Sequence, residues 1–129
     1  MSMAKNIITM SESGNIIMPE NAASIWMSEQ ELVELFGVIV PTLRAAIRAV
    51  YKSGVLKEYE VQKYVRLENG YHADVFNFPM IVALAFRIDS FGAKQVRNVI
   101  FERLYLRKEK TNIFFSLGVK DRNMSNYQA

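Results

Sequence analysis

The chain has 129 residues, of which 50% are hydrophobic and 22% charged, a balance that is typical of a folded globular domain and excludes a disordered chain. Its longest apolar run, residues 78–86, contains Pro79 and is far shorter than the roughly 20 residues that span a bilayer, and the first residues lack the apolar stretch of a secretory signal. The absence of cysteine excludes disulfides and thiolate metal sites and favours a cytoplasmic protein, while the net charge of +3 leans slightly toward a polyanionic partner.

The N-terminal segment is predicted to form a β-hairpin. Residues 11–15 read SESGN, a cluster of turn-forming residues with a glycine near its centre. On both sides of this cluster the residues are β-branched, a preference of strands: Ile7, Ile8, Ile16 and Ile17.

Residues 28–54 are predicted to form two helices joined by a tight turn. Ser28 and Glu31 have the spacing of a capping box, in which each side chain satisfies a backbone N–H of the other residue. Gly37 ends the first helix because glycine takes the left-handed conformation without strain. The second helix begins near Val40 and Pro41, ends at about Lys52 before Ser53 and Gly54, and buries the stripe Leu43, Ala46, Ile47 and Val50.

Residues 58–76 alternate with a period of about two, which predicts two strands, and Asn69-Gly70 between them is a strong signal for a hairpin turn. Helices are then predicted over residues 78–89 and 93–110, the second beginning after the sequence DSFG. We expect residues 1–112 to form one domain and residues 113–129 to form a C-terminal tail that contains an apolar cluster at 113–117.

The order of these elements is that of a winged helix-turn-helix domain. Gly37 supplies the turn, and Leu43 and Ala46 lie where the second helix must pack on the first. The hairpin that follows is the expected wing. The predicted fold is therefore α+β, a winged helix-turn-helix with an N-terminal β-hairpin and additional C-terminal helices.

Four stretches of the chain are similar to the N-terminal part of the virulence-associated RhuM-type proteins of bacteria: IWMSEQELVELFGV, IRAVYKSGVL, FNFPMIVALAFRIDS and KQVR. The resemblance covers about residues 7–107 and is carried by Trp26, Gln30, Phe36, Gly37, Gly54, Asn77, Arg87, Ser90, Gln95 and Arg97. It implies a DNA-binding, regulator-like module that is often encoded on mobile or island DNA.

The chain departs from that family in two respects. The tip of the second helix carries Ile39, Val40 and Pro41 where the family usually has polar or basic residues, so direct reading of bases there is not expected. The predicted wing is shorter and less basic, and the family's long C-terminal region is absent, which suggests a relative that acts by binding.

Two functions remain open. In the first, the chain is a transcriptional regulator that binds double-stranded DNA, with its contacts made by Thr42, Arg44, Arg48, Lys52, Lys63 and Arg66. In the second, the basic row on the second helix is a solvated face, and the frame is a protein-interaction module that docks through Ile39, Val40 and Pro41.

The helix over residues 93–110 has a broad apolar stripe, which predicts a homodimer contact through Val96, Ile100, Leu104, Phe114 and Phe115. No enzyme is expected, because the chain has no glycine-rich phosphate loop and no nucleophile with a nearby base.

His72 is the one histidine and is interpreted as an ordinary strand residue, so neither a metal nor another cofactor is expected.

Overall fold

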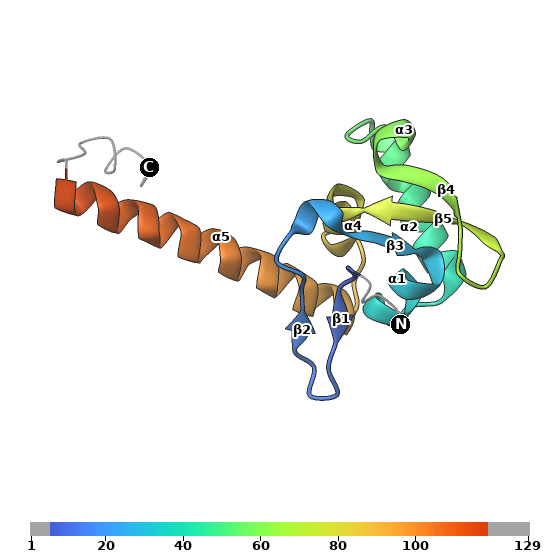
Figure 1. Ribbon diagram of the computed structural model, residues 1–129, viewed down its shortest axis with the longest axis horizontal. Helices are drawn as coiled ribbons and strands as arrows, with labels where there is room; N and C mark the ends of the chain where they lie inside the picture. The colour runs from blue at the N-terminus through green and yellow to red at the C-terminus, as the bar shows by residue number, and fades with distance from the viewer. Residues whose placement is uncertain (1–5, 119–129) are drawn as a thin grey trace. The chain divides into compact units, whose positions relative to one another are not determined.

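A computed structural model describes the backbone of residues 6–118 and the side chains of residues 6–105. The chain divides into two compact units, residues 1–97 and residues 98–129. The elements in order are β1 (Thr9–Met10), β2 (Ile16–Ile17), the 3-10 helix η1 (Ala22–Ser24), β3 (Trp26–Ser28), α1 (Glu29–Phe36), α2 (Val40–Ser53), α3 (Glu58–Val61), β4 (Gln62–Arg66), β5 (His72–Asn77), α4 (Phe78–Ala85) and α5 (Phe91–Gly118) (Figure 1). The architecture is mixed α+β with small antiparallel sheets, as predicted.

Strands β1 and β2 form the predicted N-terminal hairpin, with Thr9 opposite Ile17. The N–H of Gly14 donates to the carbonyl of Ser11 at 2.9 Å, and the N–H of Ser11 donates to the carbonyl of Asn15 at 2.8 Å. Gly14 has a φ of 90°, a left-handed conformation that favours glycine. The turn cluster of the sequence therefore closes this hairpin.

Helices α1 and α2 begin and end where the sequence predicts. The backbone N–H of Ser28 donates to Glu31 Oε1 at 2.8 Å, and the N–H of Glu31 donates to Ser28 Oγ at 3.3 Å, which completes the capping box. Gly37 ends α1 with a φ of 66°, and Gly54 ends α2 with a φ of 81°. Both glycines thus satisfy helix-terminal carbonyls from a left-handed conformation.

Strands β3, β5 and β4 form an antiparallel sheet in that order, with β5 in the centre. Tyr64 lies opposite Asp74, and Arg66 lies opposite His72. The turn between β4 and β5 differs from the predicted two-residue loop: the N–H of Gly70 donates to the carbonyl of Leu67 at 3.0 Å. Among the described residues only glycines have a positive φ, so Asn69 does not, and a type I′ turn, which needs two such residues in succession, is excluded.

The predicted strand beginning at residue 58 is wrong in its first part, since Glu58–Val61 form the short helix α3. Tyr59 is 76% exposed whereas Val61 is buried, so these two residues do not share the buried face that a strand would give them. The amide of Asn77 donates to the Glu60 carbonyl at 3.0 Å and ties α3 to the end of β5. A single helical turn therefore occupies the stretch whose alternation of residue types in the sequence predicts a strand.

The two C-terminal helices have different limits from those predicted. Helix α4 begins after Asn77, whose side chain accepts from the N–H of Met80, and it ends at Ala85 instead of Asp89. One guanidinium nitrogen of Arg97 donates to the carbonyls of Ala85 and Ile88, at 2.6 and 3.1 Å, and so satisfies acceptors at the end of α4. Helix α5 begins at Phe91 and runs to Gly118, past the predicted end at residue 110.

The core of the first unit lies between the sheet and its helices. Helix α2 contacts α4, and both lie behind the sheet in Figure 1. The fully buried side chains include Phe36, Ile25, Met27, Leu32, Leu43, Met80, Ile81 and Leu84. Within the described part of the chain, no helix combines the length and the apolar character needed to cross a membrane.

Candidate nucleic-acid interface

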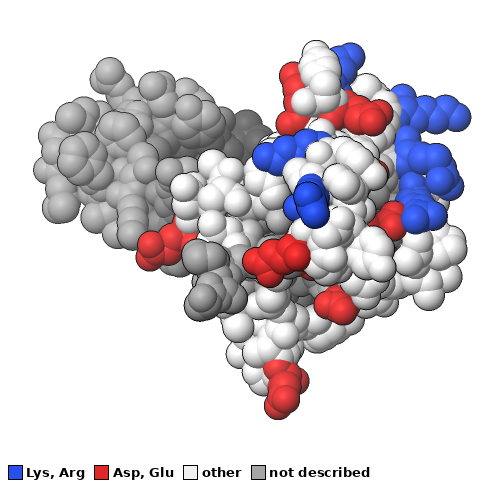
Figure 2. Space-filling view, turned by 45° about the vertical axis from the view of Figure 1, so that its right-hand side comes forward, with Lys and Arg blue, Asp and Glu red and all other residues white. Residues whose placement is uncertain are grey.

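Helix α2 presents a basic outer face. Its four predicted core residues, Leu43, Ala46, Ile47 and Val50, are buried, which turns the opposite side of the helix to the exterior. Arg48 and Lys52 are four residues apart on that outer side, and both are exposed. Thr42 is also exposed, near the start of the helix and on its flank. In Figure 2, Lys and Arg side chains gather along one edge of the molecule.

Arg44 is exposed but already has a partner. Its Nε donates to Glu29 Oε2 at 2.7 Å and its Nη2 donates to Glu29 Oε1 at 2.9 Å, a two-point contact between the first residue of α1 and the first turns of α2. The hydrogen bonds to Glu29, with its negative charge, raise the pKa of Arg44 further above its usual range. To bind a phosphate or a base, the Arg44 guanidinium must either break its contact with the Glu29 carboxylate or bind both partners at once.

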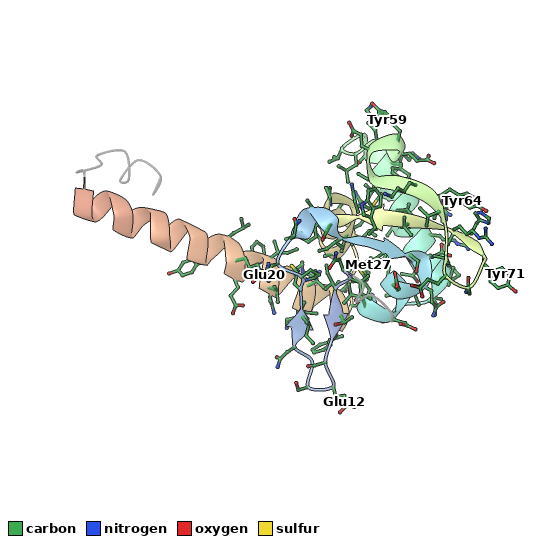
Figure 3. The ribbon with its side chains drawn as sticks, in the orientation of Figure 1. Glu12, Glu20, Met27, Tyr59, Tyr64 and Tyr71 are labelled. Atoms are coloured by element: carbon green, nitrogen blue, oxygen red, sulfur yellow. The ribbon has the colours of Figure 1, made fainter. Side chains whose placement is uncertain are left out.

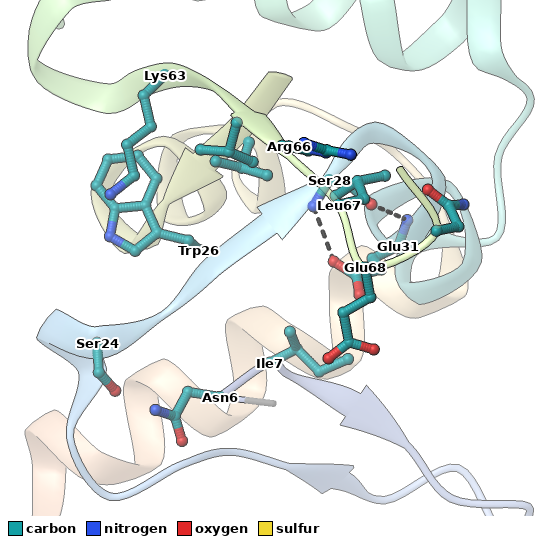
Figure 4. Close-up of a pocket in the computed structure, with 13 residues that line it drawn as sticks. Asn6, Ile7, Ser24, Trp26, Ser28, Glu31, Lys63, Arg66, Leu67 and Glu68 are labelled. Atoms are coloured by element: carbon teal, nitrogen blue, oxygen red, sulfur yellow. Dashed lines mark hydrogen bonds between the residues drawn. The ribbon is translucent and has the colours of Figure 1, made fainter. Parts of the chain in front are cut away.

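Lys63 and Arg66 lie on opposite faces of the β4–β5 hairpin. The side chains of a strand alternate between the two faces, and these residues are three apart. The ammonium of Lys63 lies 4.0 Å from the centre of the Trp26 ring, a cation–π contact that is seen in Figure 4. The alternation of the strand directs the two side chains to opposite faces, although both residues line the groove beside Trp26, and the prediction that both contact DNA from the wing stays a prediction.

Arg66 lies on the face of the hairpin that also contacts α2. Gln62 is four residues away and shares this face, and its side-chain oxygen accepts from the Tyr51 hydroxyl at 2.6 Å. Burial raises the pKa of Tyr51 to about 12, with the negative charges of Glu58 and Asp74 acting in the same direction. The hydroxyl therefore stays protonated at neutral pH and keeps the hairpin attached to α2.

The same face of the hairpin carries a pair of stacked rings. The centres of the Tyr64 and His72 rings are 5.3 Å apart, and their planes differ by 12°. Both residues are exposed, Tyr64 at 69%. Figure 3 shows Tyr64 and Tyr71 projecting from the hairpin on the side away from β3. Interpreting His72 as an ordinary strand residue missed this pair, although the predicted hairpin would have placed positions 64 and 72 on neighbouring strands near its turn.

The residues at the tip of the second helix differ in exposure. Ile39 is 67% exposed and Pro41 is exposed, whereas Val40 is half-buried. The tip is therefore apolar at the surface, and Ile39 is the N-cap residue of α2 without a side-chain hydrogen bond to the helix.

A groove of about 540 Å³ lies on the other face of the sheet, between β3, the β4–β5 turn and the N-terminal segment (Figure 4). Its lining is mixed, with Trp26, Lys63 and Val75 from the sheet and Ile7 and Glu68 from the loops around it. Among the described side chains, no three of His, Cys, Asp and Glu are grouped so that they could hold a metal ion.

The predicted dimer residues fall into three groups. Val96 is fully buried in the core of the first unit, so it is not available for contact with a second chain, and its assignment to an interface is wrong. In the second unit Ile100 is half-buried and Leu104 is 57% exposed. Phe114 and Phe115 belong to α5, but their side chains lie outside the described residues.

No protein-family model matches the chain, and neither a curated protein nor a solved structure is significantly similar to it. The resemblance to the RhuM-type proteins thus stays a prediction from the residues that carry it.

Proposed function

We propose that the chain is a winged helix-turn-helix protein that binds double-stranded DNA, with α2 in the major groove and the β4–β5 hairpin as the wing. The order β3, α1, α2, α3, β4, β5 supports this proposal, as does a sheet in which the first of these strands pairs with the last. A helix of this kind must offer a free outer face, and Arg48 and Lys52 give α2 a basic one. The exposed basic face is the observation on which the proposal chiefly rests.

The proposed contacts have separate roles. Arg48 extends from the middle of the exposed side of α2, where a guanidinium can donate two hydrogen bonds to guanine O6 and N7. Lys52, one turn further, and Thr42, at the start of the helix, would contact phosphates on either side of the groove. Arg66 would reach a phosphate from the wing, on the face that the wing shares with Gln62.

Salt-dependent binding of duplex DNA tests this proposal. We expect the wild-type protein to bind a mixed-sequence duplex with an affinity that falls steeply as salt rises. Arg48→Ala combined with Lys52→Ala should weaken binding by about 2 to 4 kcal/mol and lower the salt slope by about one for each phosphate that is no longer bound. Arg87→Ala combined with Lys94→Ala is the matched control, because it removes the same charge from exposed residues outside α2 and the hairpin. Equal losses in the two double variants would contradict the proposed interface.

A protein-interaction module is the second candidate, and the exposure of Ile39 is the observation that favours it. In that case the apolar tip of α2 docks on another protein, and the duplex is not bound even at low salt. On DNA, the same side chain would instead pack against thymine methyl groups, a weakly selective contact. Ile39→Asp separates the two, since it should abolish protein docking while weakening DNA binding only in proportion to its added charge.

The regulatory role belongs to the same proposal: a transcriptional regulator of the RhuM type, acting in the cytoplasm as a homodimer. Two-fold association would give the protein two half-sites on DNA. With Val96 assigned to the core, the contact would use Ile100, Leu104 and the following turns of α5. Sedimentation that gives a monomer at high protein concentration would remove the dimer from the proposal without affecting DNA binding.

A further inference from the structure

We infer that the β4–β5 hairpin binds an unpaired base beside the duplex, by stacking it on the Tyr64–His72 pair. The preferred ligand would then be a duplex with a single-stranded extension or an opened end, not a continuous duplex. This inference rests on the proposed function, because α2 supplies the duplex contact that brings the hairpin to the junction.

The first argument is the geometry of the two rings. Their planes are nearly parallel and their centres are 5.3 Å apart, so the two rings stack on each other. The two rings are stacked with a lateral offset, and Tyr64 is 69% exposed, so it remains accessible to a ligand. A base that stacks on such a ring costs little side-chain entropy, since the ring is ordered before binding. Stacking on an aromatic residue accepts any base, because every base has a flat π face.

The second argument is that the pair does not suit the usual ligand of a wing. The minor groove of B-DNA is about 6 Å wide and admits a single extended side chain, such as an arginine. Two stacked rings with centres 5.3 Å apart are broader than this once the van der Waals thickness of each ring is added. They would remain outside the groove, where a paired base offers them only its edge. An unpaired base offers its whole face.

The third argument is the distribution of charge around the pair. Arg66 lies directly opposite His72 toward the turn, is exposed, and can neutralise a phosphate of the strand that carries the stacked base. Asp74 lies directly opposite Tyr64 and repels phosphates there. The backbone of the bound strand should therefore pass on the Arg66 side, and the base should lie toward Asp74, whose carboxylate can accept hydrogen bonds from base amino groups.

The fourth argument is the connection of the hairpin to α2. The Tyr51 hydroxyl donates to Gln62 at 2.6 Å, and Gln62 is two residues before Tyr64 on the same face of β4. The ring pair is thereby held at a fixed position relative to the basic face of α2. A junction that places duplex against α2 can then place its first unpaired base against the hairpin.

The experiment compares three kinds of fluorescent DNA probe by anisotropy. They are a blunt duplex, the same duplex with a six-nucleotide extension on one strand or on the other, and the single-stranded extension alone. Base–aromatic stacking contributes about 1 to 3 kcal/mol, so we expect the extended duplex to bind roughly 5- to 150-fold more tightly than the blunt duplex. Tyr64→Ala should remove this difference and leave the affinity for the blunt duplex unchanged. Tyr64→Phe keeps a ring and should retain it, and Tyr71→Ala, which removes an exposed tyrosine outside the pair, should retain it as well.

The outcomes separate this inference from the proposed function. Equal affinity for blunt and extended duplexes, or a Tyr64→Ala variant that weakens both equally, overturns the inference and leaves duplex binding intact. Failure to bind the blunt duplex, together with Tyr64-dependent binding of the single strand, overturns the duplex function and supports stacking. Circular dichroism and thermal unfolding of Tyr64→Ala check that the loss is not one of folding.

Discussion

Arg44 on α2 and Glu29 on α1 form a two-point ion pair, with nitrogen–oxygen distances of 2.7 and 2.9 Å. The pair joins α1 to α2, the helix that would contact DNA, and it occupies a guanidinium that the proposed interface would otherwise present to the ligand. Exposed ion pairs contribute little to stability, so the pair can open at small cost when a phosphate competes for the arginine. In the proposed interface, Glu29 would therefore compete with DNA for Arg44.

This competition leads to a prediction about affinity. Glu29→Gln should strengthen duplex binding by roughly three- to tenfold, because it releases Arg44 and removes one negative charge near the phosphates. Glu34→Gln changes the charge of α1 by the same amount at an exposed glutamate that accepts a hydrogen bond from Gln30, not from an arginine. Anisotropy titrations at one salt concentration measure both variants. Equal effects would mean that total charge, not the release of Arg44, sets the affinity.

Close packing at Gly92 predicts a large loss of stability on a small substitution. A Cβ at this position would collide with the carbonyl oxygen of Leu35 and come within 2.8 Å of Phe36 Cα, so the start of α5 lies against the end of α1. Alanine normally stabilises a helix by about 1 kcal/mol relative to glycine. Here we expect Gly92→Ala to lower the free energy of unfolding by about 2 to 4 kcal/mol, measured by urea titration.

Gly54→Ala is the matched control for this substitution. A Cβ at Gly54 would meet no atom within 4 Å, but the residue has a φ of 81°. Its effect should be a loss of about 1 to 2 kcal/mol, the cost of a left-handed conformation for an L-residue. If Gly92→Ala destabilises the protein no more than Gly54→Ala does, the close packing of α5 on α1 is contradicted.

The capping box at the start of α1 predicts a moderate effect. Ser28→Ala removes the acceptor for the N–H of Glu31 and should lower the free energy of unfolding by about 1 kcal/mol. Ser13→Ala, in the exposed turn of the first hairpin, should change it by less than about 0.5 kcal/mol. Chemical denaturation with a common m-value compares the two. An equal change would show that the cap does not stabilise α1.

The pKa of Tyr51 predicts how stability changes in alkali. This pKa is raised to about 12, chiefly by burial, whereas an unfolded chain has a tyrosine pKa of about 10. Between these values the folded protein keeps a proton that the unfolded chain has released, so the stabilisation present below pH 10 is lost as the pH rises through about 12. Tyr51→Phe should therefore show a smaller fall in unfolding free energy from pH 10 to pH 12 than the wild type. From pH 6 to pH 8 the plots of unfolding free energy against pH should be parallel for the wild type and Tyr51→Phe. If the two plots stay parallel up to pH 12, the raised pKa is contradicted.

The first half of the fold could be predicted because its signals are local. Ser28 with Glu31, and the glycines at positions 37 and 54, each fix a helix end through bonds within a few residues. The four-residue helix α3 could not be predicted in this way, because one helical turn is too short to show a periodicity. The burial of Val96 could not be predicted either, since an apolar stripe in a sequence does not show whether the same domain or a second chain covers it.

The candidate site was predicted less well because it depends on contacts between distant residues. Arg44 and Glu29 are fifteen residues apart, and nothing in their local sequence indicates that they meet. The separation of Lys63 from Arg66 was, by contrast, available in advance: an odd spacing within a strand places two side chains on opposite faces. The stacked pair of Tyr64 and His72 also follows from the register of the hairpin once its turn is known.

The alternation of β4 restricts how this hairpin can vary. Deleting one residue between Gln62 and Arg66 would invert every side chain beyond the deletion, so that the residues now on the face of Lys63 would exchange faces with those on the face of Gln62. Insertions between Leu67 and Tyr71 would lengthen the loop without this exchange. Natural variants of this protein should therefore tolerate loops of many lengths but only even changes in the strand.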